Sequence, residues 1–97
     1  MIHQNWKTPH DGNFDFFEEE NGPRLGFMNL LLTDSGRIVI KHTEVDPEHG
    51  SKGIGKKLLE AVVDFALENN FKVLPTCPFA KNLMMRDPER YQDLMIG

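Results

Sequence analysis

The chain has 97 residues, of which 39% are hydrophobic and 27% charged, with a formal net charge of −4 at pH 7. This composition is typical of one small folded domain over residues 1–97 and excludes a disordered chain. No apolar run is long enough to span a membrane, and no secretory signal is visible at the N-terminus. The single cysteine excludes an internal disulfide and zinc sites of the CxxC kind, so we expect a cytoplasmic protein with no metal site.

The charge is unevenly distributed along the chain. The first 51 residues carry 4 Lys and Arg against 9 Asp and Glu, whereas residues 52–97 carry 7 against 6. A nucleic-acid-binding protein would usually present a broad basic face. One local basic spot in an acidic background instead favours a small anionic ligand, with no nucleic acid and no membrane as partner.

The first half of the chain predicts an antiparallel β-meander. After a weak strand signal near residues 3–8, the strand patterns cover residues 13–20, 24–34 and 37–45. The turn signals "NGP" and "DSG" separate these patterns, and turns this short join antiparallel neighbours. The acidic "EEE" that ends the first clear strand is expected to be a solvated strand end.

The second half changes to a helical period. Apolar residues from Gly53 onward recur at helical spacing to about Asn69, where "NN" favours a stop. A strand at 71–77, a short helix at 78–87 and a final helical turn or two follow. A right-handed crossover would place strands 37–45 and 71–77 parallel. The predicted fold class is therefore α/β (α+β): a mixed, mostly antiparallel sheet with helices packed on it.

The stretch "EHGSKGIGKKLLEAVV" contains three lysines where the long helix begins, although a helix N-terminus prefers acidic side chains. A P-loop would match "GSKGIGK", but Lys57 stands where a Ser or Thr should hold magnesium. A dinucleotide-binding fingerprint fails because Leu58 replaces its third glycine. The remaining alternative is the acyl-CoA loop Q/R-x-x-G-x-G/A, whose last three positions match Gly53-Ile54-Gly55.

The segment "HTEVDPEHGSKGIGKKLLEAVVDFALENNFKVLPTCPFAKN" (42–82) resembles the GNAT superfamily of N-acetyltransferases. Its "HT-V" strand end, glycine loop and "CPF" strand end occur in the order of the small single-domain branch that is YjdJ-like or N-acetyltransferase-domain-containing-protein-1-like. Residues 13–95 follow the order of elements of that branch. The resemblance implies a minimal GNAT-like fold with a β-α-β acyl-CoA-binding unit, and an acetyl-CoA-dependent N-acetyltransferase acting on an unidentified amine.

The resemblance also implies a role for the loop between Gly50 and Lys57. Backbone N–H groups of the loop and the first helical turn would bind the pyrophosphate of coenzyme A, which a helix N-terminus favours physically. The implied cofactor-binding residues are Ser51, Lys52, Gly53, Ile54, Gly55, Lys56 and Lys57 in the loop, with Thr43 and Val45 along the pantetheine arm. The sequence departs from the pattern at Gly50, where the family has Gln or Arg.

Three residues are candidates for the chemistry. Cys77 lies between a strand and a helix, a position that favours a thiolate, so it could accept the acetyl group, line the acceptor site or serve as a buried apolar residue. His42 and Glu44 share one face of a strand, and either could be the general base for the amine or a structural surface residue. A non-catalytic acyl-CoA-binding module and a small interaction protein are the alternative functions. The expected oligomeric state is a monomer or a homodimer.

Overall fold

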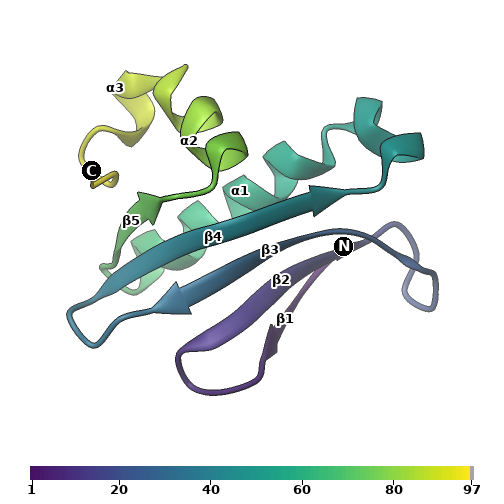
Figure 1. Ribbon diagram of the computed structural model, residues 1–97, viewed down its shortest axis with the longest axis horizontal. Helices are drawn as coiled ribbons and strands as arrows, with labels where there is room; N and C mark the ends of the chain where they lie inside the picture. Colours follow the sequence, from purple (N-terminus) through teal and green to yellow (C-terminus); the bar gives the residue numbers. More distant parts are fainter. Residues whose placement is uncertain (97) are drawn as a thin grey trace.

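The computed structural model describes residues 1–96, although the side chains at positions 50 and 51 are not among the described parts. Five strands form one sheet in the order β1-β2-β3-β4-β5, and α1 packs along one of its faces (Figure 1). Only β4 and β5 pair in parallel, so the sheet is mixed and mostly antiparallel, as predicted.

The β-meander consists of β1 (Ile2–Trp6), β2 (Asp11–Phe17), β3 (Arg24–Leu32) and β4 (Arg37–Val45). The weak first strand signal is thereby confirmed. The prediction that the next strand reaches residue 20 was wrong, because the pairing register shifts between Phe16 and Phe17 and residues 18–20 lie outside the strand. Short loops join all four strands, so no helix interrupts this part of the chain.

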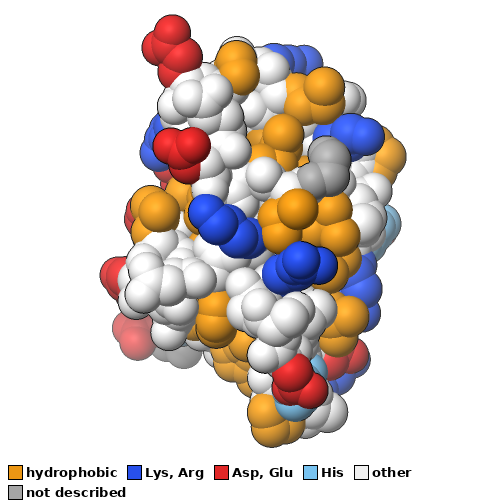
Figure 2. All heavy atoms as spheres, turned by 90° about the vertical axis from the view of Figure 1, so that its left-hand side faces the viewer, with side chains coloured by type: hydrophobic (Ala, Val, Ile, Leu, Met, Phe, Trp, Pro, Cys, Tyr) orange, Lys and Arg blue, Asp and Glu red, His pale blue; other side chains and the backbone are white. Residues whose placement is uncertain are grey.

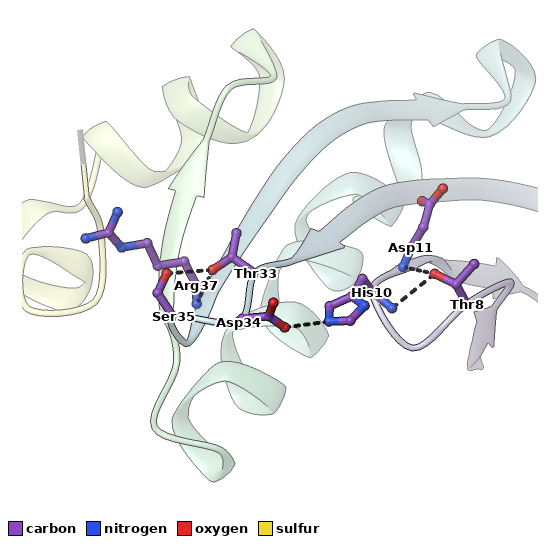
Figure 3. Close-up of polar contacts among 7 residues, drawn as sticks. All are labelled: Thr8, His10, Asp11, Thr33, Asp34, Ser35 and Arg37. Carbon is purple, nitrogen blue, oxygen red and sulfur yellow. Dashed lines mark hydrogen bonds and ion pairs between the residues drawn. The ribbon is translucent and has the colours of Figure 1, made fainter.

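Two loops at one end of the sheet are tied by side chains (Figure 3). Thr8 Oγ1 accepts hydrogen bonds from the backbone N–H groups of His10 and Asp11 in the β1–β2 loop. His10 Nε2 lies 2.8 Å from Asp34 Oδ1 in the β3–β4 turn. These polar contacts stabilise the end of the sheet that lies away from the glycine loop.

The segment between β4 and β5 contains a 3₁₀-helix that the sequence did not reveal. This helix, η1 (Pro47–Lys52), is capped by Asp46, whose side chain accepts from the N–H of Glu48. It leads into α1 (Ile54–Glu68), which ends beside Asn69 as predicted. The following strand β5 (Lys72–Pro75) is shorter than the predicted range of 71–77.

The helices α2 (Pro78–Met85) and α3 (Pro88–Tyr91) complete the fold on the same side as α1. The core lies between α1 and the sheet, because alternate side chains of each strand face the helix. Its fully buried side chains include Phe14, Met28, Leu30, Ile38, Ile40, Leu58, Leu59 and Met84. No helix within residues 1–96 has the length and apolarity needed to cross a membrane.

The segment after α3 covers the outer edge of β5. The N–H of Val73 donates to Leu94 O at 2.9 Å, and the N–H of Ile96 donates to Val73 O at 2.8 Å. The side of the molecule near the C-terminus shows apolar groups interspersed with Lys and Arg side chains (Figure 2). Among the described strands, β1 has an unpaired outer edge, and β4 has one beyond Ile40, where its pairing with β5 ends.

Candidate active site

The two parallel strands separate halfway along β4. Residues Arg37–Ile40 pair with Lys72–Pro75, and the backbone N–H groups of Thr76 and Cys77 then both donate to Ile40 O. After this point the chain turns into α2, whereas β4 continues for five more residues to Val45. A gap therefore opens beside the second half of β4.

The backbone of β4 presents hydrogen-bonding groups to this gap. In an antiparallel ladder, the residues that bond to the partner strand alternate with those whose polar groups face the other edge. The N–H of Asp46 donates to Leu25 O at 2.7 Å, so the polar backbone groups of Glu44 face β3. Those of Thr43 and Val45 consequently face the gap, where the resemblance implies contacts with pantetheine.

A β-bulge at Lys41 determines which side chains face the helices. Asn29 pairs with His42 and Leu30 with Ile40, so Lys41 has no direct partner and the alternation shifts by one residue. Beyond the bulge, Thr43 lies opposite the buried Met28 on the helix-covered face. His42 and Glu44 therefore lie on the face that no described helix covers.

A groove of about 640 Å³ runs along this open face at the end of β3 and β4. His42 Nε2 lies 3.5 Å from Glu44 Oε1, and both side chains are more than half exposed. The ring of Phe27 lies next to His42, and the guanidinium of Arg24 lies 4.4 Å from the centre of that ring. Thr43 and Val45 border the same groove, so it meets the gap beside β4.

Cys77 occupies the closed end of the gap. It is buried, and its Sγ donates to Thr43 Oγ1 at 3.4 Å. The structure therefore brings Cys77 and Thr43 together on the helix-covered face. The only hydrogen-bond partner of its Sγ among the described residues is this hydroxyl, which is not a general base.

The start of α1 can accept an anion. Gly53 is the N-cap of the helix, and none of the described side chains caps the free N–H groups that follow it. Gly53 has φ +70°, and a Cβ at this position would meet no atom of the described residues within 4 Å. Open space therefore lies against the amide end of the helix, and this geometry fits the pyrophosphate of a CoA ligand.

Gly55 lacks a side chain for a different reason. The ring of Phe79 lies against it, and a Cβ on Gly55 would come within 2.2 Å of that ring. The structure thus gives Gly55 a packing reason that the glycine pattern of the sequence did not reveal. Its missing side chain makes room for α2, although its backbone N–H still belongs to the first turn of α1.

The three lysines of the loop point in different directions. Lys52 Nζ forms an ion pair with Glu18 at 2.8 Å, and Lys57 Nζ lies 5.7 Å from the centre of the Phe16 ring. Lys56 instead lies on the side of α1 that faces α2 and α3. The three cations therefore flank the helix start on two sides and do not converge on one point.

The three glutamates of the acidic "EEE" are exposed, as expected, and Glu18 also forms an ion pair with Lys52. Glu18 is not merely solvated, because the hydrogen bond and charge of Lys52 hold the pKa of its carboxyl below the ordinary value. A lysine in the loop and a glutamate 34 residues earlier share no local pattern, so the sequence could not reveal this pair.

Five of the predicted site residues form two groups joined by the end of β4, apart from those of the loop. Thr43, Val45 and Cys77 lie along the gap, and His42 and Glu44 lie on the open face beside it. Ser51 lies outside the residues whose side chains are described. Sequence reasoning missed Arg24, Phe27 and Phe79, since only the pairing of strands and helices brings them to the site.

A splayed pair of parallel strands beside a glycine-capped helix, in a sheet built on a β-meander, fits the fold that the resemblance to the GNAT superfamily implied. The family model of the GCN5-related N-acetyltransferases matches residues 13–94, and the chain belongs to this family. The assignment of the chain to an acyltransferase family is thereby confirmed, whereas the smaller branch stays a prediction.

One solved structure supports the same fold. It is the solution structure of a GCN5-like protein from Staphylococcus aureus, with a proposed N-acetyltransferase activity, and it is 37% identical to this chain. The similarity covers 100% of this chain and 88% of that one, with a TM-score of 0.75. The comparison with curated protein sequences gave no match.

Proposed function

We propose that this enzyme transfers an acetyl group from acetyl-CoA to a primary amine. The observation that carries the proposal is the start of α1, which is open and has no cap among the described side chains. The chain reaches this helix start directly from the half of β4 whose edge is free. When bound, acetyl-CoA would supply the thioester acetyl group. Family membership supports the acyl transfer, and the arrangement of the chain's own residues supports the identity of the donor and the positions of the two substrates.

The loop and the first turn of α1 would hold the pyrophosphate. Uncapped N–H groups and the helix dipole attract an anion here, and Gly53 leaves the approach open. Ser51, Lys52, Gly53, Ile54, Gly55, Lys56 and Lys57 are the proposed binding residues of this segment. Lys52 would exchange its ion pair with Glu18 for the ligand phosphate, because both residues are about half exposed and no burial fixes the pair.

The gap beside β4 would hold the pantetheine arm and the acetyl group. The backbone groups of Thr43 and Val45 face the gap and are free to form strand-like hydrogen bonds with the amides of the arm. A fixed backbone N–H near the carbonyl would also stabilise the charge that develops on its oxygen. Cys77 closes this end of the gap and contacts Thr43, so we assign it a positioning role.

The amine would approach along the open face of the sheet. His42 and Glu44 border the groove there and lie 3.5 Å apart, so the imidazole can take a proton from the amine while the carboxylate stabilises the imidazolium. The amine nitrogen would then attack the carbonyl carbon of the acetyl group, the C–S bond would break, and the CoA sulfur would leave as the thiol with the proton held by the imidazolium. A nucleophile needs an adjacent base, which Cys77 lacks among the described residues, so direct transfer is the favoured route.

A binding and turnover test separates this function from its alternative. At a hundredfold excess over its dissociation constant, CoA should stabilise the protein by about 2.7 kcal/mol. This corresponds to a rise of roughly 10 °C or more in melting temperature for a domain of this size, and adenosine should give none. Release of free thiol from acetyl-CoA with a panel of amines then measures turnover.

Each outcome has one meaning. Stabilisation together with thiol release supports the acetyltransferase. Stabilisation by CoA without turnover on any amine would identify a non-catalytic acyl-CoA-binding module. No stabilisation at millimolar CoA would contradict both functions and leave the chain without its proposed ligand.

A further inference from the structure

A cleft of about 280 Å³ separates α1 from α2 and α3. It starts at Lys56, in the first turn of α1, and its apolar floor includes Leu59 and Leu83. Arg86 at the C-cap of α2 and Arg90 on α3 extend the basic lining, and Asp87 is the only acidic residue among the described residues that line it. The cleft is therefore basic in a chain whose net charge is negative.

Two of these three cations have no anionic partner among the described residues. Arg90 donates to Glu60 Oε2 on α1, and the hydroxyl of Tyr91 donates to Glu60 Oε1 at 3.3 Å. Glu60 thus neutralises Arg90 within the protein. Lys56 and Arg86 form no ion pair with any carboxylate in the described part of the chain.

Unpaired cations above an apolar floor suit a compact dianion. A guanidinium matches the geometry of a phosphate and binds it through two parallel N–H groups, and an ammonium adds a point charge. The apolar floor excludes water on one side, which strengthens the attraction. The other two lysines of the loop do not line this cleft, because Lys52 lies toward Glu18 and Lys57 toward Phe16.

We propose that Lys56 and Arg86 form a subsite for the ribose 3′-phosphate of coenzyme A. The proposal rests on the function proposed above, since it places the pyrophosphate at the start of α1. The 3′-phosphate is attached to the same ribose as that pyrophosphate, so it is the second anion within reach of Lys56. The subsite makes the enzyme prefer CoA to 3′-dephospho-CoA.

The test compares these two ligands, which differ by this one phosphate. We expect the wild-type protein to bind CoA about tenfold more tightly than dephospho-CoA in calorimetric titrations at low salt. Arg86→Gln should lower the affinity for CoA several-fold and leave that for dephospho-CoA unchanged, so that the ratio approaches one. Lys56→Gln should lower the ratio as well.

Two further variants control for charge and position. Asp87→Asn removes the one carboxylate of the cleft and should raise the ratio. Lys81→Gln removes an exposed cation of α2 that does not line the cleft, and it should leave the ratio at the wild-type value. Raising the salt concentration should reduce the wild-type ratio, because the discrimination is electrostatic.

A wild-type ratio near one would overturn the subsite, as would an Arg86→Gln protein that weakens both ligands equally. Either result leaves CoA binding at the loop intact. Absence of CoA binding altogether would instead contradict the proposed function itself. Melting curves of the ligand-free variants show whether each one is folded.

Discussion

Cys77 is the residue whose surroundings say most about the route of transfer. Its thiol is buried and donates to Thr43 Oγ1, and the His42–Glu44 pair lies on the other face of β4. A cysteine that accepts the acetyl group would need a base to take its proton. The arrangement therefore favours attack by the amine itself, with Cys77 as part of the wall.

We therefore predict that Cys77→Ser keeps its rate within about a factor of ten, whereas His42→Ala lowers kcat by roughly 10²–10⁴-fold. His10→Gln is the control, because His10 contacts Asp34 at the far end of the sheet and should not affect the rate. Steady-state thiol release measures all three. An acetyl group found on the wild-type protein by mass spectrometry without any amine, and absent from Cys77→Ser, would establish the acyl-cysteine route instead.

Gly53 matters for its backbone conformation. Its φ of +70° lies in the left-handed region, which a residue with a Cβ adopts at a cost of about 1–2 kcal/mol. We predict that Gly53→Val lowers the free energy of unfolding by about this amount, measured by urea denaturation. The space around the Cα is open, so strain and not collision is the cause.

Asparagine provides the matched comparison at the same position, because it tolerates the left-handed region better than valine. Gly53→Asn should therefore lie between the wild-type protein and Gly53→Val in stability. Equal stability of the Asn and Val variants would show that backbone strain does not determine the choice of glycine here. Both variants would also place a side chain in front of the free N–H groups, so CoA affinity should fall in each.

At the scale of elements, α1 and α2 meet where Gly55 contacts the Phe79 ring. We predict that Gly55→Ala destabilises the protein by about 1 kcal/mol, the lower part of the range for overpacking, because the partly exposed ring can move toward solvent. Phe79→Ala in the same chain should remove this effect, since the added methyl group then has room. Thermal or urea unfolding of the wild-type protein, the two single variants and the double variant gives the coupling energy between the two positions.

The sign of that coupling decides the interpretation. If Gly55→Ala is as destabilising without the ring as with it, the two residues do not compete for one space, and the contact between α1 and α2 is arranged differently. The same four proteins should be tested for CoA binding. A loss of affinity in Gly55→Ala that Phe79→Ala restores would show that α2 controls access to the first turn of α1.

At the scale of the whole molecule, the sequence predicted the order of strands and helices and the parallel pairing of β4 with β5. These features follow from local periodicity and from turn residues, which act within a few positions. The glycine loop was also visible, because a glycine pattern beside a helical period is a local signal. Comparison with known proteins confirmed the family to which it pointed.

Features that depend on pairing could not be predicted. The bulge at Lys41 decides that Thr43 faces Cys77 and that His42 faces the groove, and a register shift leaves no mark in the spacing of residues. The basic residues that line the cleft come from α1, the end of α2 and α3, and they lie close together only when the three helices pack. The 3₁₀-helix η1 is short, and its proline and glutamate suit a turn equally well.

The contact between α1 and α3 should make the stability of the whole molecule depend on pH in the alkaline range. Tyr91 is buried, and this burial, together with the negative charge of Glu60, raises the pKa of its hydroxyl above the ordinary value. The unfolded chain then releases this proton first, at about pH 10. The contribution of Tyr91 is therefore present below pH 10 and is lost as the pH rises through the raised pKa of the folded state.

We predict that, between about pH 9 and 11, the melting temperature of the wild-type protein falls more steeply with pH than that of Tyr91→Phe. This range covers roughly one pH unit on either side of the ordinary pKa of tyrosine. Phenylalanine keeps the packing and cannot ionise, and the lysines titrate alike in both proteins. Tyr91 is the only tyrosine in the chain, so ultraviolet titration reports its pKa directly. Glu60→Gln should move that pKa back toward the ordinary value; a tyrosine that already titrates there in the wild-type protein would show that neither burial nor Glu60 acts on it.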